Sequence, residues 1–240
     1  MSDAEALAGF IDKWRERWPE WRVAEVFVPQ DVRASCVAWF ALQQELAEAA
    51  WGGSDPRPGE AKLGWWAEEL QGWSQGRRRH PLGLVLQRLP APWLRLAACV
   101  PALIASREAS ASREQAFEML SPVAQAIAVV EAAVFDAPAS DIDAVTQALL
   151  ALQLLIVGDA AAPLQVRARG GDGSRADAFA RAWASDLLQA WSEDRGGPRP
   201  LRIRQALLRG RLRRFVAGAP RLQAVPALAT LRIAWRAARG

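Results

Sequence analysis

Apolar side chains recur along most of the chain at intervals of three and four residues, the spacing of one face of an α-helix. Proline or glycine interrupts these stripes, so each stripe predicts a separate helix. Pro92 and Pro122 are predicted to begin two helices, and Ser140 and Ser174 to cap two others. The expected helices run up to residue 18 and then over about 29–50, 59–75, 81–89, 92–107, a short stretch after Ser112, 122–135, 142–157, 174–191, 201–215 and from Pro226 onward.

Composition supports this pattern and adds a charge asymmetry. Ala, Leu, Arg, Glu and Gln are abundant and Tyr is absent, which favours helices over strands. We predict one all-α domain over residues 1–240. Residues 1–160 carry 14 basic and 21 acidic side chains, whereas residues 161–240 carry 16 and 5. The basic part indicates an anionic partner (nucleic acid, a membrane surface or a diphosphate) or an ordinary solvated arginine face, and both remain open.

Two cysteines, Cys36 and Cys99, lie in apolar helical surroundings and are expected to be buried thiols. The first ten residues lack the pattern of a secretory signal. The longest apolar run, residues 148–157, is shorter than the roughly 20 residues of a membrane span. We therefore expect a soluble, cytoplasmic protein, with peripheral contact at the inner face of the membrane as an open alternative.

The stretch 41–81 is the most informative part of the chain, with four of the twelve tryptophans and the only histidine. Its order of residues resembles the squalene/phytoene synthase family, in particular the branch that includes phytoene-synthase-like complex I assembly proteins. The resemblance covers roughly the first 135 residues. It rests on Arg33, Ala41-Leu42-x-x-Glu45-Leu46, Gly59-Glu60-x-x-Leu63, Trp65-Trp66-x-x-Glu69-Leu70, His80-Pro81, Pro92-Trp93-x-x-Leu96 and Glu114-Gln115-Ala116-Phe117.

This resemblance implies an isoprenoid-synthase-like helical bundle around a central, largely apolar cavity. In that family, two aspartate-rich motifs on facing helices bind Mg²⁺ and the substrate diphosphate. Here the first motif position retains Glu45 and Glu48, which share a helix face but include no Asp. At the second, residues 144–158 contain no carboxylate, and Gln153 followed by Asp159 is the remaining similarity. No cofactor is expected, unless transferase activity survives, in which case Mg²⁺ is required.

Each candidate residue also has an ordinary structural interpretation. Glu45 and Glu48 could hold one Mg²⁺ or form a partly buried polar patch. Trp66 could line an isoprenoid cavity or belong to the core. His80 could be a general base, although a structural His-Pro turn is the more usual role. The candidate pocket residues are Arg33, Glu45, Glu48, Trp66, Glu69, Arg77, His80 and Gln153.

Charged pairs and basic segments leave similar alternatives. Glu68 and Glu69 point about 100° apart on a helix, so one is expected to pair with an arginine and the other to meet water. Residues 77–79 could bind phosphate groups or simply be solvated. The basic helix 202–214 could lie on an anionic membrane, whereas nucleic acid is not expected because no nucleic-acid-binding fold accompanies it.

Three functional hypotheses follow. The preferred one is a non-catalytic relative of prenyl synthases that binds an isoprenoid or quinone-type lipid or acts as an assembly factor. The second is an active isoprenoid diphosphate transferase with atypical Glu and Arg groups at the diphosphate. The third is an interaction module that recognises a protein partner through its acidic and basic parts.

Overall fold

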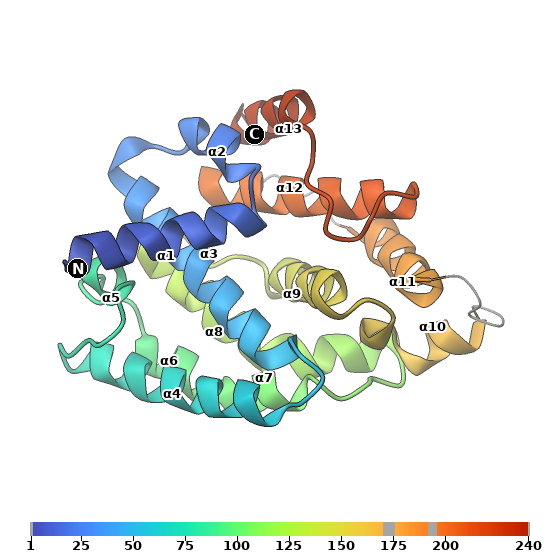
Figure 1. Cartoon of the computed structure of the whole chain (residues 1–240), viewed down its shortest axis with the longest axis horizontal. Coiled ribbons are helices and arrows are strands. Elements are labelled where there is room, and N and C mark those ends of the chain that lie inside the picture. Colours follow the sequence, from blue (N-terminus) through green and yellow to red (C-terminus); the bar gives the residue numbers. More distant parts are fainter. Residues whose placement is uncertain (1, 170–175, 192–195, 240) are drawn as a thin grey trace.

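The computed structural model describes residues 2–169, 176–191 and 196–239. Every element in these ranges is a helix and none is a strand, which confirms the all-α prediction (Figure 1). The elements are α1 (Asp3–Arg17), α2 (Trp21–Ala24), η1 (Glu25–Phe27), α3 (Gln30–Trp51), α4 (Arg57–Ser74), α5 (Gly83–Leu86), α6 (Trp93–Ala98), α7 (Val100–Ala105), α8 (Arg113–Phe135), α9 (Ile142–Val157), η2 (Gly158–Ala161), α10 (Leu164–Arg169), α11 (Ala178–Gln189), α12 (Arg199–Val216) and α13 (Ala227–Arg239).

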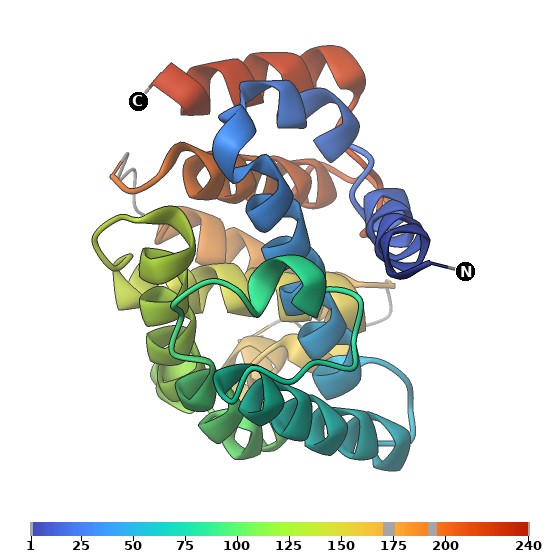
Figure 2. The same cartoon turned by 90° about the vertical axis from the view of Figure 1, so that its left-hand side faces the viewer.

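The helices form layers around α3. Figures 1 and 2 show α13 and α12 at one end of the molecule, α4 at the other, and α3, α8 and α9 between them. Nearly every side chain of α3 from Cys36 to Trp51 is buried, as expected for a helix that is apolar on all sides. The core is rich in tryptophan, and the fully buried ones are Trp21, Trp39, Trp51, Trp66, Trp73, Trp93 and Trp183.

Helix α8 differs from the sequence prediction because it runs through Pro122 instead of beginning there. A proline inside a helix removes the hydrogen bond to the carbonyl four residues earlier, which here belongs to Glu118. Both Pro122 and Glu118 are exposed, so water can solvate that carbonyl. The buried neighbours Leu120 and Val123 hold the helix together on its inner side.

Two further boundaries depart from the prediction. The helix expected over 92–107 is broken into α6 and α7, because Pro101 in the first turn of α7 cannot donate a backbone hydrogen bond. Helix α9 is capped by Asp141, whose carboxylate accepts from the Ala144 amide at 3.1 Å, and not by Ser140. Ser174 lies outside the described residues, and α11 begins after Asp177.

Two helical stretches, α8 and residues 142–161, are long and apolar enough to cross a membrane by length and composition alone. At least half of the most apolar window in each is buried inside the protein, and core helices of soluble proteins have the same character. Both predicted thiols, Cys36 and Cys99, are buried and free.

Candidate functional site

A buried carboxylate on α8, Glu131, is the centre of the polar cluster inside the bundle. Its side chain is 4% exposed. Its carboxylate accepts hydrogen bonds from Trp39 Nε1 at 3.2 Å, Gln43 Nε2 at 3.1 Å and Ser140 Oγ at 3.4 Å. Helix α3 therefore supplies two donors to Glu131, and the α8–α9 connection supplies the third.

Arg204 on α12 completes this cluster. Its Nη1 lies 3.9 Å from Glu131 Oε1 and also donates to Gln43 Oε1. Its guanidinium lies over the ring of Phe40, 4.7 Å from the centroid, which is a favourable position for a cation. We refer to Glu131, Arg204, Gln43 and Trp39 as the central polar cluster.

Burial raises the pKa of Glu131, and the nearby positive charge of Arg204 opposes that rise. The hydrogen bonds from Trp39, Gln43 and Ser140 also oppose it, because they stabilise the ionised form. The net direction is upward, so Glu131 takes up a proton more readily than an exposed glutamate. A neutral Glu131 can donate a hydrogen bond, whereas an ionised one can only accept.

Two small neighbouring cavities lie between the central polar cluster and the surface near α9 and α12. The inner cavity, of about 30 Å³, is lined by Gln43, Glu131 and Arg204 together with apolar side chains of α8, α9 and α12. The outer cavity has a volume of about 140 Å³. Both are lined by Leu201 and Gln205 of α12, so they are neighbours along one cleft, which we call the α9–α12 cleft.

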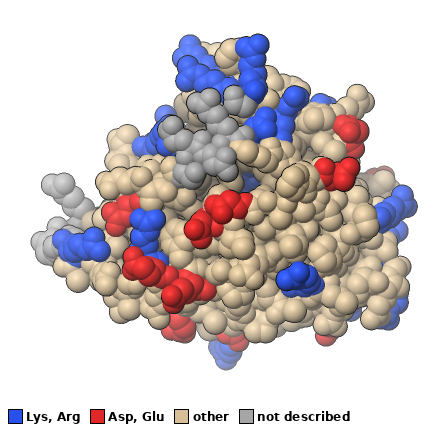
Figure 3. All heavy atoms as spheres, turned by 180° about the vertical axis from the view of Figure 1, so that it is seen from behind, with Lys and Arg blue, Asp and Glu red and all other residues tan. Residues whose placement is uncertain are grey.

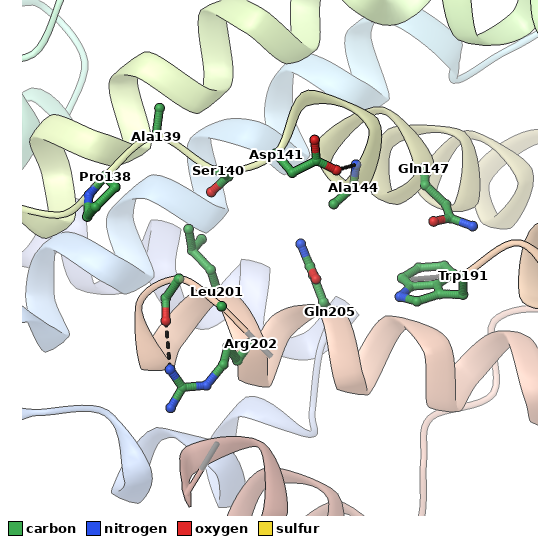
Figure 4. Close-up of a pocket in the computed structure, with 12 residues that line it drawn as sticks. Pro138, Ala139, Ser140, Asp141, Ala144, Gln147, Trp191, Leu201, Arg202 and Gln205 are labelled. Carbon is green, nitrogen blue, oxygen red and sulfur yellow. Dashed lines mark hydrogen bonds between the residues drawn. The ribbon is translucent and has the colours of Figure 1, made fainter. Parts of the chain in front are cut away.

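Figure 4 shows the outer part of the α9–α12 cleft. Side chains of α9 and α12 face each other across it, and Trp191 lies at one end. The guanidinium of Arg202 is not available to a ligand at the mouth of the cleft, because it donates to the Gly197 carbonyl and to the Ala237 and Ala238 carbonyls of α13. The cleft is therefore polar at its inner end and mixed at its mouth. That inner end suits a ligand oxygen that accepts hydrogen bonds from Arg204 or from protonated Glu131.

The structure places Glu45 and Glu48 away from this cleft. Relative to Gln43, which points at Glu131, they lie about 140–200° around α3. Glu45 pairs with Lys62 of α4, and Glu48 pairs with Arg17 of α1 at 2.8 Å. Both line a cavity of only about 10 Å³ against α1. They form the partly buried polar patch that was one of the two alternatives.

Gln153 lies in a different place again. Its Nε2 donates to the Ser106 carbonyl at 2.8 Å, and Trp51 Nε1 donates to the Ser106 hydroxyl at 2.9 Å. Gln153 lines a cavity of about 20 Å³ between α8, α9 and the segment after α7. Arg33 lines neither cavity of the cleft, and it donates to the Val28 carbonyl at 2.9 Å. Within the described part of the chain, no group of three or more His, Cys, Asp or Glu side chains could hold a metal ion.

The remaining candidates surround Glu69, which organises the loop between α4 and α5. Glu69 Oε1 accepts from Trp73 Nε1 and from the backbone amides of Arg79 and His80, each at 2.8 Å. Arg79 Nε adds an ion pair at 3.1 Å, and Glu68 is largely exposed. The expected division between a paired and a solvated glutamate is confirmed only in part, because the exposed Glu68 also pairs with Arg79, at 3.4 Å.

The contacts of His80 favour the structural role over that of a general base. Its Nδ1 accepts from the Leu82 amide at 3.1 Å, and its ring packs 4.6 Å from the rings of Phe10 and Trp66. Burial lowers the pKa of His80 to about 4, so the ring is neutral near pH 7. Trp66 is fully buried, in agreement with its core interpretation. Arg77 is exposed and donates to Gln75.

Sequence reasoning missed both charged members of the central polar cluster. Glu131 is the only charged residue between Val123 and Phe135, and a lone carboxylate in such a run is a sign of a paired, buried group. Arg204 had no comparable sign, because it is one of many arginines in its helix.

Comparison with protein-family models found no match to the chain, and comparison with curated proteins found no significant match. The resemblance to squalene and phytoene synthases therefore rests on the residues quoted above.

Proposed function

We propose that this protein is a non-catalytic, isoprenoid-synthase-like helical bundle that binds an isoprenoid or quinone-type lipid in the α9–α12 cleft. The resemblance over the first 135 residues supports the choice of ligand class. The position and chemistry of the cleft support its role as the binding site. An assembly-factor role is compatible with the same binding. A lipid in the cleft would contact α9 and α12, and a partner bound to these helices would distinguish the occupied protein from the empty one.

The observation that carries the non-catalytic part is the direction of Glu45 and Glu48. Diphosphate ionisation needs carboxylates from two helices to converge on one cavity. Here Glu45 and Glu48 face α4 and α1 in ion pairs, while Gln153 lines another cavity. The two motif positions therefore do not share a site, and each Glu already has a cationic side chain as its partner. The transferase alternative requires these pairs to be broken.

The polar end of the cleft supports a ligand with a hydrogen-bond-accepting head. Arg204 supplies a cation and Glu131 supplies a carboxyl group of raised pKa, so a quinone carbonyl or a phosphate oxygen would find donors there. The outer cavity of about 140 Å³ is smaller than the roughly 300 Å³ of typical ligand pockets. A complete prenyl chain would therefore require α9 and α12 to separate, and the head with its first isoprene unit is the part that would enter first.

Purified protein incubated with geranylgeranyl diphosphate and Mg²⁺, or with a short-chain quinone, tests the proposal. Retained lipid without diphosphate release is the expected result. The Ala144→Trp variant should abolish retention, because Ala144 is half-buried and lines the outer cavity. Ala133→Trp, at a half-buried position of α8 that lines neither cavity of the cleft, is the matched control and should retain lipid.

Two results would overturn the proposal. Diphosphate release that disappears in Glu45→Gln/Glu48→Gln would show that the protein is a transferase. The absence of any retained lipid would remove the binding function and leave the interaction module as the surviving hypothesis.

A further inference from the structure

Helix α13 exposes three large apolar side chains on one face. Leu228, Leu231 and Trp235 are 74%, 44% and 48% exposed, and their spacing of three, four and seven residues places them together on one side of the helix. The opposite side is fixed to the protein by the buried residues Thr230 and Ala234. The strong amphipathic pattern of α13 thus has its apolar outer stripe in contact with water.

Arginines line one edge of this stripe. Arg232, Arg236 and Arg239 are all exposed, and their helical positions fall beside those of Leu228 and Trp235. Arg239 lies over the Trp235 ring, 4.6 Å from the centroid. No Asp or Glu occurs after residue 194, so α13 itself carries only positive charge. Figure 3 shows basic side chains gathered at the top of the molecule, where α13 lies in Figure 1.

The elements that pack beside α13 also expose an apolar and a basic side chain. α13 packs against α2 and η1, where Val26 is 66% exposed and Arg22 is also exposed. The two acidic residues of this neighbourhood are already paired. Glu25 pairs with Arg15 at 2.9 Å, and the buried Glu20 pairs with Arg211 at 2.6 Å.

The α13 surface is preformed. Arg202 of α12 donates to the Ala237 and Ala238 carbonyls at 2.9 and 3.2 Å and so secures the end of α13. Gly210 of α12 allows close packing, because a Cβ there would lie 3.1 Å from Ile233 Cδ1. The helix is held flat against the body, and its apolar stripe points outward.

We propose that the outer face of α13, formed by Leu228, Leu231 and Trp235 with Arg232, Arg236 and Arg239, docks on an anionic lipid membrane. The arginines would contact lipid phosphates, while the leucines and the tryptophan enter the boundary between headgroups and acyl chains. Positive charge on a helix that carries no carboxylate of its own favours an anionic lipid surface as the occupant. This proposal does not depend on the α9–α12 cleft, and it places the contact on α13 and not on the basic helix 202–214 considered from the sequence.

Vesicle co-sedimentation of the full chain tests the proposal. The vesicles contain phosphatidylcholine alone or phosphatidylcholine with one quarter phosphatidylglycerol, at low and high salt. Binding is expected only to the anionic vesicles and should weaken at high salt, because salt screens the attraction. Arg232→Gln/Arg236→Gln/Arg239→Gln should weaken binding by about 100-fold, since each arginine contributes to the attraction independently.

Matched variants separate this surface from general charge and hydrophobicity. Arg88→Gln/Arg95→Gln/Arg169→Gln removes the same charge from exposed positions elsewhere and should bind almost as the unmodified protein does. Leu228→Ser/Leu231→Ser should lose binding, whereas Leu94→Ser/Leu164→Ser, at positions 55% and 51% exposed, should retain it.

Three outcomes would overturn the proposal. These are failure of the unmodified protein to bind anionic vesicles, equal loss of binding in the two arginine triples, and a dimer in analytical ultracentrifugation that Leu228→Ser/Leu231→Ser dissociates. The last outcome would identify a second copy of the chain as the occupant of this face. Circular dichroism of each variant confirms that the helices remain folded.

Discussion

Removal of the Arg204 charge should show how much the central polar cluster contributes to the free energy of unfolding. Arg204 Nη1 and Glu131 Oε1 are 3.9 Å apart. At the effective dielectric constant of about 20 that suits such pairs, their Coulomb attraction is about 4 kcal/mol. Breaking a buried pair by removing one partner typically costs 3–5 kcal/mol. We therefore expect Arg204→Met to lower the free energy of unfolding by about 4 kcal/mol at pH values where Glu131 is ionised.

The same variant should be strongly pH-dependent. Without Arg204, no positive charge opposes the effect of burial, so the pKa of Glu131 in the folded protein rises further above its ordinary value of 4.5. Between these two pKa values, the folded protein holds a proton on Glu131 that the unfolded chain releases. More protons bound in the folded state means that the free energy of unfolding falls as the pH rises through this window. The loss caused by Arg204→Met should therefore be smaller at the lower pH than at the higher pH.

Urea unfolding of four proteins measures this effect. These are the unmodified chain, Arg204→Met, Glu131→Gln and the double variant, each near pH 5 and near pH 8. Glu131→Gln should abolish the additional pH dependence of Arg204→Met, and the double variant should be more stable near pH 8 than Arg204→Met alone. An equal loss at both pH values, or a double variant no better than the single one, would show that Glu131 does not interact with Arg204 as inferred.

Three further changes test other parts of the structure by urea or thermal unfolding. Arg211→Met should cost about 3–5 kcal/mol, because it leaves Glu20 buried without its cation; a cost below 1 kcal/mol would contradict this. Burial raises the pKa of Glu69, but its four hydrogen bonds outweigh that effect and lower it. The contribution of Glu69 to the free energy of unfolding is therefore present above pH 4.5 and lost as the pH falls through the pKa of Glu69 in the folded protein. A Glu69→Gln variant that shows the same loss of stability in acid would refute the assignment. Pro122→Ala should stabilise the protein by about 2 kcal/mol, the helix-interior cost of proline less its effect on the unfolded chain, and destabilisation would contradict the account of α8.

Helix periodicity predicted the fold class because most helices here are longer than three turns and bury one face. The errors fell where two local signals competed. Pro122 is a helix breaker in isolation, but its exposed position leaves only one solvated carbonyl to compensate. Pro101 lies in a continuous apolar run, and there its missing amide does end one helix and begin another. Both prolines are exposed, but Glu118, four residues before Pro122, is exposed, whereas Ala97, four residues before Pro101, is buried. The burial of the residue whose carbonyl loses its partner depends on tertiary packing and is absent from the local sequence.

The candidate site was harder to predict than the fold. The sequence singled out carboxylates by their spacing, and Glu45, Glu48 and Glu69 all proved to be paired with cations on neighbouring elements. Spacing indicates which side chains share a helix face, but it does not say which neighbour that face meets. Glu131 had no partner at helical spacing; its lone position in an apolar run indicates burial, but its partners become visible only when α3 and α12 are packed around it.

The charge asymmetry of the chain has a partly internal explanation. The acidic first part and the basic last part meet inside the molecule, where Arg204 and Arg211 of α12 reach Glu131 and Glu20. Arg204 and Arg211 thus face the interior of the protein and add little to the charge of its outer surface. The arginines of α13 have no such carboxylate beside them on their own helix and remain exposed. Since a basic segment attracts an anionic partner only through charge that the fold leaves accessible, α13 should respond to an anionic surface more strongly than α12, of whose arginines only Arg199 and Arg213 are exposed.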